Sequence, residues 1–406
     1  MERDRRCPRC GQVIPWGETA CPLCSEHRGF FWSLRRDTFL LVISAMLVLL
    51  FVATGFAVRS YHGREERLAR DWNKRGEEAL QTGHADRALV DFRNALFHAR
   101  DSPLYQLRLA QALAATGHVA QARAYLLSLQ ERDPGNGTVN LELARLAAGE
   151  HNISEAVRYY HDAVYCEWEG DAVARRRAVR LELVKFLIDS DQKETARAEL
   201  IAVAANLPPD PELQTKVGAL LSDVGGCDDA LRLFRQALAA APRSAPALVG
   251  AGECYFQSGH YTEAQRYLDR AVRQDGSLAR AASMLATARA VLSLDPFMRQ
   301  LGEQAKARRA RLDFTQSLAR LQACATQLGI DLKGAGGSRL QALDAEAVAV
   351  QPRAQESHLR RDPQLLSYVM DVVFEIETAT AQVCGEPRGQ DLALLLIARQ
   401  QEGARP

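Results

Sequence analysis

Residues 252–271 read GECYFQSGHYTEAQRYLDRA, and this stretch decides the fold because its pattern of residue types recurs along the chain. A small residue, Gly252, precedes Ala264 by just over three helical turns, and the bulky Leu268 comes one turn after that alanine. The preceding stretch 218–237, GALLSDVGGCDDALRLFRQA, carries the same residue types in the same order and at the same spacing. The shift between the two stretches is the period that is typical of two-helix units that stack on one another.

Six alanines mark these units and recur at one constant spacing, except for a longer interval between the third and the fourth: Ala88, Ala122, Ala156, Ala196, Ala230 and Ala264. A residue that is small in five of the six units comes before each alanine at a fixed distance: Gly76, Ala110, Ala144, Val184, Gly218 and Gly252. Bulky apolar residues lie one helical turn after the alanines: Phe92, Leu126, Tyr160, Leu200, Phe234 and Leu268. We expect the small residues to let paired helices approach closely and the bulky ones to fill the interior between them.

Glycines fall at one shared position between the expected helices of four units: Gly83, Gly117, Gly225 and Gly259. This position suits a helix end that needs a positive φ angle. The whole pattern resembles the tetratricopeptide repeat family over residues 69–276, with a capping helix expected at 279–293. The resemblance implies an all-α solenoid of six repeats over 69–293, with a concave groove lined by the first helix of each unit.

By this resemblance, six polar residues are expected to face the groove and contact protein partners: Asn73, Glu77, Gln111, Arg145, Lys185 and Glu253. Some members of the family bind a C-terminal carboxylate through basic and asparagine side chains. Only scattered elements of that clamp are present here, so we do not carry its specificity over. The alternative for each of these residues is an ordinary solvated polar side chain.

Two Cys-x-x-Cys pairs stand near the start of the chain, Cys7/Cys10 and Cys21/Cys24, separated by a short intervening segment. Four thiolates in two tight turns form the donor set of a closed, structural zinc site. The segment 1–30 resembles the short zinc ribbons of bacterial N-termini, and the metal would supply its folding free energy. The alternative is a redox dithiol, which needs a βαβ context that the neighbouring sequence does not offer.

Residues 38–58 form a continuous run without a charged side chain. As a helix this run is ~31 Å long, which is enough to cross a bilayer, so we predict one transmembrane helix followed by a short linker at 59–68. Arginines flank the run on both sides and do not decide its orientation. Zinc thiolates persist best in a reducing compartment, so we predict a cytoplasmic ribbon and extracytoplasmic, periplasmic repeats.

The tail, residues 296–406, lacks the repeat pattern but has apolar residues at helical spacing, as in Phe314, Leu318 and Leu321. We predict a small helical C-terminal domain. Cys324 and Cys384 are the two cysteines in it, and we predict that they form a disulfide. The alternative is two buried apolar thiols.

The charge balance is near neutral, with 51 Lys and Arg against 50 Asp and Glu, and does not indicate nucleic-acid binding by the whole chain. We find no phosphate-binding loop, nucleophile elbow or His-Glu-x-x-His motif, so neither an enzyme nor a small-molecule substrate is predicted. The prediction is a single-pass scaffold of the inner membrane that recruits protein partners.

Two other functions stay open. One is a membrane regulator whose ribbon binds nucleic acid or a cytosolic protein, which the arginines beside the first cysteine pair favour: Arg3, Arg5, Arg6 and Arg9. The other is a thiol–disulfide oxidoreductase that uses the Cys-x-x-Cys pairs.

Overall fold

The computed structural model describes residues 5–168, 170–334 and 337–404, with side chains at all of these except 25–38 and 402–404. Arg3 and the middle of the glycine-rich break, residues 335–336, lie outside this description. The chain forms two compact units, Met1–Trp168 and Glu169–Pro406. Among the described residues the regular elements are all helical, and strand-like pairing is confined to two isolated bridges.

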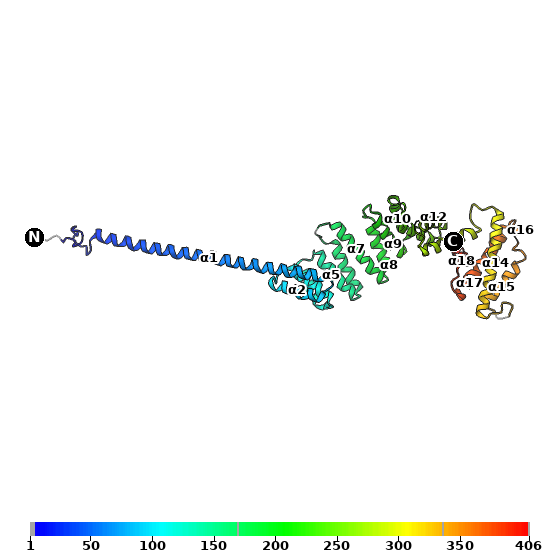
Figure 1. Cartoon of the computed structure of the whole chain (residues 1–406), viewed down its shortest axis with the longest axis horizontal. Coiled ribbons are helices and arrows are strands. Elements are labelled where there is room, and N and C mark those ends of the chain that lie inside the picture. The colour runs from blue at the N-terminus through cyan, green and yellow to red at the C-terminus, as the bar shows by residue number, and fades with distance from the viewer. Residues whose placement is uncertain (1–4, 169, 335–336, 405–406) are drawn as a thin grey trace. The chain divides into compact units, whose positions relative to one another are not determined.

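The first unit begins with the ribbon and contains three helical pairs, the long helix α1 included (Figure 1). Its helices are α1 (Pro22–Gln81), α2 (Ala85–His98), α3 (Pro103–Ala115), α4 (Val119–Arg132), α5 (Gly137–Gly149) and α6 (Ile153–Tyr165). The C-terminal end of α1 is the first helix of the first repeat. Residues 59–68, which we expected as a linker, are therefore helical and continuous with the apolar run.

The second unit contains three more helical pairs, a capping helix and the tail. The pairs are α7 (Ala172–Asp189) with α8 (Lys193–Ala204), α9 (Pro211–Asp223) with α10 (Cys227–Ala240), and α11 (Ala245–Gln257) with α12 (Tyr261–Gln274). The capping helix is α13 (Ala279–Leu294). The α7 helix is more than a turn longer than α9, which accounts for most of the wider interval between Ala156 and Ala196.

The residues of the repeat pattern pack as the spacing predicts. All six alanines of the second helices are fully buried. A Cβ atom placed on Gly218 would lie 2.9 Å from the ring of Phe234, and one on Gly252 would lie 2.7 Å from Leu268. In these two repeats, the glycine of the first helix therefore leaves room for the bulky residue of the second.

The turn between paired helices needs a left-handed residue in every repeat. The four glycines predicted for this position have φ angles between 75° and 80°. In the other two repeats the same position is held by His151 and Asp191, each with φ of 56°. Neither residue type is a glycine, so the glycine pattern did not indicate a positive φ angle at these two positions.

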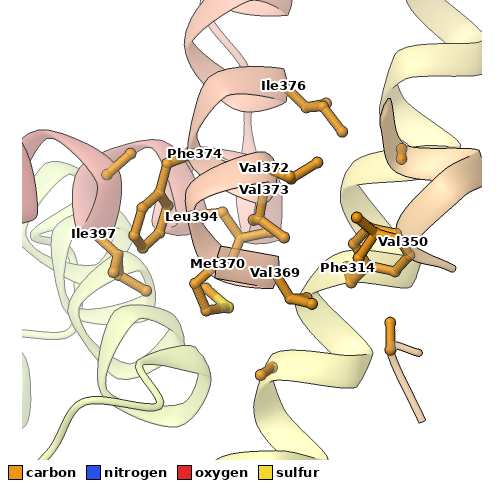
Figure 2. Packing of buried hydrophobic residues seen from close by; sticks show 14 of the residues in the cluster. Phe314, Val350, Val369, Met370, Val372, Val373, Phe374, Ile376, Leu394 and Ile397 are labelled. Atoms are coloured by element: carbon orange, nitrogen blue, oxygen red, sulfur yellow. The ribbon is translucent and has the colours of Figure 1, made fainter. Parts of the chain in front are cut away.

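The tail forms five helices: α14 (Glu303–Leu328), α15 (Arg339–Val350), α16 (Glu356–Leu359), α17 (Pro363–Cys384) and α18 (Gly389–Ala404). Figure 2 shows the labelled α17 side chains, from Val369 to Ile376, packed around Leu394 and Ile397 of α18, with Phe314 and Val350 on the side away from Ile397. The same core includes Tyr261, Ala288 and Val291, so the tail packs on the end of the solenoid in this unit.

Candidate metal centre and protein-binding surface

The first cysteine pair lies in a tight backbone turn. The Cys7 N–H donates to the carbonyl of Gln12 at 2.8 Å, and the Gly11 N–H donates to the carbonyl of Cys7 at 3.0 Å. Gly11 has a φ of 73°, which a side chain would strain. A short antiparallel bridge between Arg6 and Val13 closes the turn. This local structure holds the sulfurs of both cysteines on one side of the turn.

The second pair lies where α1 begins. Cys21 is the N-cap residue of α1, and the Cys24 N–H donates to the Cys21 carbonyl at 3.1 Å. The four sulfur atoms lie within 4.8 Å of one another, and the Sγ atoms of Cys10 and Cys21 are 3.6 Å apart. A tetrahedral ion bound at about 2.3 Å from each sulfur requires sulfurs roughly 3.8 Å apart. The four cysteines therefore have the spacing and the donor chemistry to bind one metal ion.

The electrostatics of this cluster also favour a bound cation. Hydrogen bonds from the backbone of Arg9 and Cys10 lower the pKa of the Cys7 thiol to about 7. The side chain of Cys10, followed by burial, raises the pKa of Cys24 to about 12. A negative charge on one sulfur thus opposes ionisation of its neighbour. A divalent cation at the centre removes this opposition and allows all four thiolates to form.

The apolar part of α1 has the properties of a membrane span. From Phe39 onward the helix includes an 18-residue window with a mean hydropathy of 2.7, and none of that window is buried. The hydroxyl of Ser44 donates to the Leu41 carbonyl at 3.0 Å, and that of Thr54 donates to the Leu50 carbonyl at 2.7 Å. The two hydroxyls are thus satisfied within the helix, as an apolar environment requires. By length and composition, this helix is a candidate span.

The predicted groove residues of the first unit belong to one hydrogen-bonded network. Asn73 Nδ2 donates to Glu77 Oε1 at 3.2 Å. Arg108 of the next repeat lies 3.1 Å from the same Glu77 oxygen and also donates to Gln111 Oε1 at 3.1 Å. The network therefore passes from the first repeat to the second along their first helices.

The network continues into the third repeat. Gln111 Nε2 donates to Glu142 Oε1 at 2.8 Å, and Arg145 Nη1 donates to the same oxygen at 3.1 Å. We call the six residues the polar ladder: Asn73, Glu77, Arg108, Gln111, Glu142 and Arg145. The sequence interpretation missed Arg108 and Glu142. Each is a polar residue that comes slightly less than one repeat after a predicted groove residue: Arg108 after Glu77, and Glu142 after Gln111. At this spacing the side chain reaches back to the preceding repeat, and the spacing is the signal that identifies both residues.

The remaining two predicted groove residues lie in the second unit. Lys185 is exposed on α7. Glu253 of α11 is half-buried, and its Oε1 lies 3.2 Å from Nε of Arg280 on the capping helix. Glu253 is thus occupied by an ion pair at the end of the solenoid.

A second surface feature of the first unit was not predicted. A cavity of about 380 Å³ opens between α2, α3 and α4. The exposed ring of Phe97 and the buried side chains of Leu109 and Leu113 line it, together with Arg93 and Arg100. The Arg100 guanidinium lies 5.7 Å from the centre of the Phe97 ring. The cavity therefore combines an apolar floor with a basic rim.

In the tail, the structure brings together the two cysteines that we predicted to pair. Cys324 of α14 and Cys384 at the end of α17 are joined by a disulfide, with their Cα atoms 5.9 Å apart. The bond links the two longest helices of the tail beside its apolar core.

Comparison with known proteins supports the repeat assignment. The sequence model of the family described as Tetratricopeptide repeat matches residues 79–139 and 227–288. No curated protein matches the chain in sequence.

Several solved structures also match parts of the chain at low sequence identity. YrrB, described as a tetratricopeptide repeat protein with an unusual peptide-binding site, is 20% identical, with a TM-score of 0.37 over 47% of this chain and 95% of its own. The type IV pilus biogenesis factor PilW is 15% identical, with a TM-score of 0.37 over 53% and 96%. The C-terminal part of a repeat protein from Cytophaga hutchinsonii is 14% identical, with a TM-score of 0.43 over 57% and 94%.

The matched segments fall in the first and second units, and both carry the alanine and glycine pattern described above. The chain is an all-α repeat protein of the solenoid class. Residues 79–139 and 227–288 are similar to tetratricopeptide repeats, and the helical pairs outside them carry the same alanine pattern.

Proposed function

We propose that the chain is a membrane-anchored scaffold that recruits protein partners in the cell envelope and has no catalytic activity. Its domains are a zinc ribbon (1–30), a transmembrane helix (38–58), a solenoid (69–293) and a helical C-terminal domain (296–406). The ribbon lies in the cytoplasm, and the solenoid lies in the periplasm or an equivalent compartment.

The polar ladder is the observation that carries this proposal. Its residues are held by one another on the first helices of three successive repeats, so they are fixed in position before a partner arrives. Arg108 and Glu77 remain about one-third exposed, and Arg145 is nearly half exposed. Fixed, accessible donors and acceptors favour binding because little side-chain entropy is lost on contact.

The charges of the polar ladder indicate the kind of partner. Two arginines balance two glutamates, so the ladder has no net charge to select a strongly acidic or basic ligand. It offers both donors and acceptors, and Asn73 Oδ1 is buried without a hydrogen-bond partner. An extended polypeptide presents alternating N–H and C=O groups that match such a surface. We therefore propose an extended peptide segment as the partner's contact.

Zinc is the metal we propose for the ribbon. Four cysteines at tetrahedral spacing favour zinc, and the set leaves no open position for a substrate. The metal would be bound by Cys7, Cys10, Cys21 and Cys24 and would have a structural role. The ribbon lacks an apolar core of its own, so its fold would depend on the ion.

The orientation is supported by the two kinds of cysteine chemistry in the chain. Four metal-binding thiolates before the span are suited to a reducing compartment. The Cys324–Cys384 disulfide after the span is suited to an oxidising one. A single span between them separates the two conditions.

Crosslinking in intact cells tests the recruitment proposal. We would place a photo-activatable side chain at Gln111 in the polar ladder and, as a control, at Glu131, an exposed position on the second helix α4. We expect a discrete protein adduct from position 111 and none from position 131. The adduct should be lost with Glu77→Ala, which removes the ladder's 3.1 Å contact with Arg108 that a substitution at position 111 leaves in place, and should persist with Glu131→Ala. Equal adducts from both positions would contradict a binding role for the ladder.

The ribbon supports a second candidate function, namely regulation through a cytosolic nucleic acid or protein. Arg5, Arg6 and Arg9 are all exposed around the first cysteine pair. A cluster of exposed arginines favours an anionic partner. Binding of the isolated zinc-loaded ribbon to DNA, lost above moderate salt and with Arg6→Ala, would favour this candidate.

A further inference from the structure

Two cysteines of the solenoid lie almost at bonding distance. Cys227 is the first residue of α10, and Cys254 lies in the next helix, α11. Their Sγ atoms are 2.6 Å apart. A disulfide bond is about 2.0 Å long, so a small adjustment of two side chains brings these sulfurs together.

The surroundings of this pair distinguish its two sulfurs. Cys254 is fully buried, and its Sγ lies 3.3 Å from Oγ of Ser222. Cys227 is only partly buried, and its Sγ lies 3.3 Å from Oε1 of Gln257. Cys227 is therefore the sulfur that a reagent from solution reaches first.

The two sulfurs belong to neighbouring repeats. Cys227 begins the second helix of the fifth repeat, and Cys254 lies in the first helix of the sixth. A bond between them would fasten one repeat to the next. In a solenoid each repeat is held mainly by its neighbours, so such a bond stiffens the array at that junction.

The roles of the other cysteines beyond the ribbon leave these two available to each other. Of the five, Cys324 and Cys384 form the tail disulfide. Cys166 lies in the first unit, where its sulfur accepts a hydrogen bond from Asn140 Nδ2 at 3.2 Å. Cys227 and Cys254 are the two that remain.

We propose that Cys227 and Cys254 form a reversible dithiol–disulfide pair that fastens the fifth repeat to the sixth when oxidised. A low-molecular-weight disulfide such as glutathione disulfide is the oxidant. The proposal does not rest on the membrane topology, since it concerns the chemistry of the folded chain itself.

The reaction has two exchange steps. The Cys227 thiolate attacks one sulfur of the oxidant, the oxidant's S–S bond breaks, and one glutathione thiolate leaves. Cys254 then loses its proton to solvent and attacks the Cys227 sulfur, and the second glutathione leaves as a thiolate. The two leaving thiolates take up the protons. Two protein thiols are oxidised, and one disulfide is reduced to two thiols.

The order of these steps follows from the environment of each sulfur. Burial, followed by the adjacent Cys227 side chain, raises the pKa of Cys254 to about 12. Cys254 thus stays protonated near neutral pH and does not react first. Once Cys227 carries the mixed disulfide, the neighbouring Cys254 is placed to resolve it.

Equilibration of the purified full-length chain with glutathione redox buffers tests the proposal. The reaction is quenched with acid, free thiols are alkylated, and peptides are identified by mass spectrometry. We expect a peptide pair linked through Cys227 and Cys254 under oxidising ratios, and its disappearance under reducing ratios. Cys166→Ser should leave this behaviour unchanged.

A variant separates the two steps. Cys254→Ser should trap glutathione on Cys227, because the resolving sulfur is absent. Thermal unfolding of the oxidised wild-type chain should have a higher midpoint than that of the reduced chain, and Cys227→Ser should narrow the difference to the part that the Cys324–Cys384 disulfide contributes. Full alkylation of both residues in the oxidised wild type, or stable glutathione on Cys227 in the presence of Cys254, would overturn the proposal.

Discussion

Single residues fix how closely the helices of each repeat approach. Ala230 is fully buried in α10, one helical turn before Phe234, and the ring of Phe234 lies against Gly218 of α9. Close approach at this crossing leaves no volume for a longer side chain. The recurrence of alanine at this position in all six repeats has the same physical cause.

We therefore expect Ala230→Leu to overpack the fifth repeat and to lower the free energy of unfolding by roughly 1–3 kcal/mol. Thermal unfolding of the purified chain, followed by circular dichroism, measures the change. Ala239→Leu is the matched control, since Ala239 is exposed on the same helix and the substitution there should be nearly neutral. Equal effects from the two variants would mean that Ala230 does not lie at a close helix crossing.

A buried carboxylic acid in the tail gives a second prediction at this scale. Asp313 of α14 is fully buried, and neither of its carboxylate oxygens has a hydrogen-bond partner. Burial raises its pKa to about 8, with Asp295 and Glu377 acting in the same direction and Arg309 in the opposite one. The folded chain therefore holds a proton that an unfolded aspartate, with a pKa of 3.8, has already lost.

The sign of the pH dependence follows. The stabilisation that the protonated Asp313 gives to the folded chain is fully present below about pH 4 and is lost as the pH rises through about 8. The tail should therefore be less stable at pH 8 than at pH 5. The slope is at most about 1.4 kcal/mol per pH unit for one proton. Asp313→Asn should reduce the slope, leaving the part due to the buried Glu377, whose pKa burial also raises to about 8, and Asp228→Asn, at an exposed position, should not change it. Amide hydrogen exchange of α14, corrected for intrinsic rates, measures the slope, and greater protection at high pH would contradict the prediction.

At the scale of elements, the ribbon differs from the helices because packing alone does not hold it. Of its four cysteines, only Cys7 and Cys21 are buried, and its backbone hydrogen bonds are few. Under the proposed zinc site, metal coordination would supply the remaining stability.

Cys21→Ser should accordingly abolish stoichiometric zinc in the purified chain and unfold the ribbon while leaving the helical content of the repeats unchanged. Metal analysis by mass spectrometry, together with circular dichroism, checks both outcomes. Cys166→Ser is the control that removes a thiol outside the ribbon. Chain prepared under reducing conditions that contains no zinc would refute the zinc site.

The helices of the repeats could be predicted from the sequence because their signals are local and periodic. Ala88 and Phe92 identify the second helix of a unit, and Gly83 identifies the turn before it. The turns at His151 and Asp191 could not be predicted in this way, since a left-handed residue other than glycine is imposed by the packing of its repeat rather than by its own preference.

The candidate sites also differ in whether the sequence alone could predict them. The cysteine cluster depends on short spacings between Cys7 and Cys24, and the spacing alone indicated it. The polar ladder depends on contacts between repeats, so the resemblance indicated Gln111 but not its partner Glu142. The pair formed by Cys227 and Cys254 needs the three-dimensional arrangement of two helices, and no sequence motif marks it.

At the scale of the whole chain, the proposed scaffold requires that α1 join two compartments. The helix continues without a break from Pro22 to Gln81, so the candidate span and the first repeat share one element. A ribbon, a span and a solenoid in this order would couple a cytoplasmic metal site to a periplasmic binding surface.

The topology of the chain tests this proposal most directly. Alkaline phosphatase, which is active only after export, and a reporter that functions only in the cytosol would each be fused after Pro406. We predict an active phosphatase and a silent cytosolic reporter at this end, and the opposite result for the same reporters placed before Met1. A silent phosphatase with an active cytosolic reporter after Pro406 would contradict an extracytoplasmic solenoid.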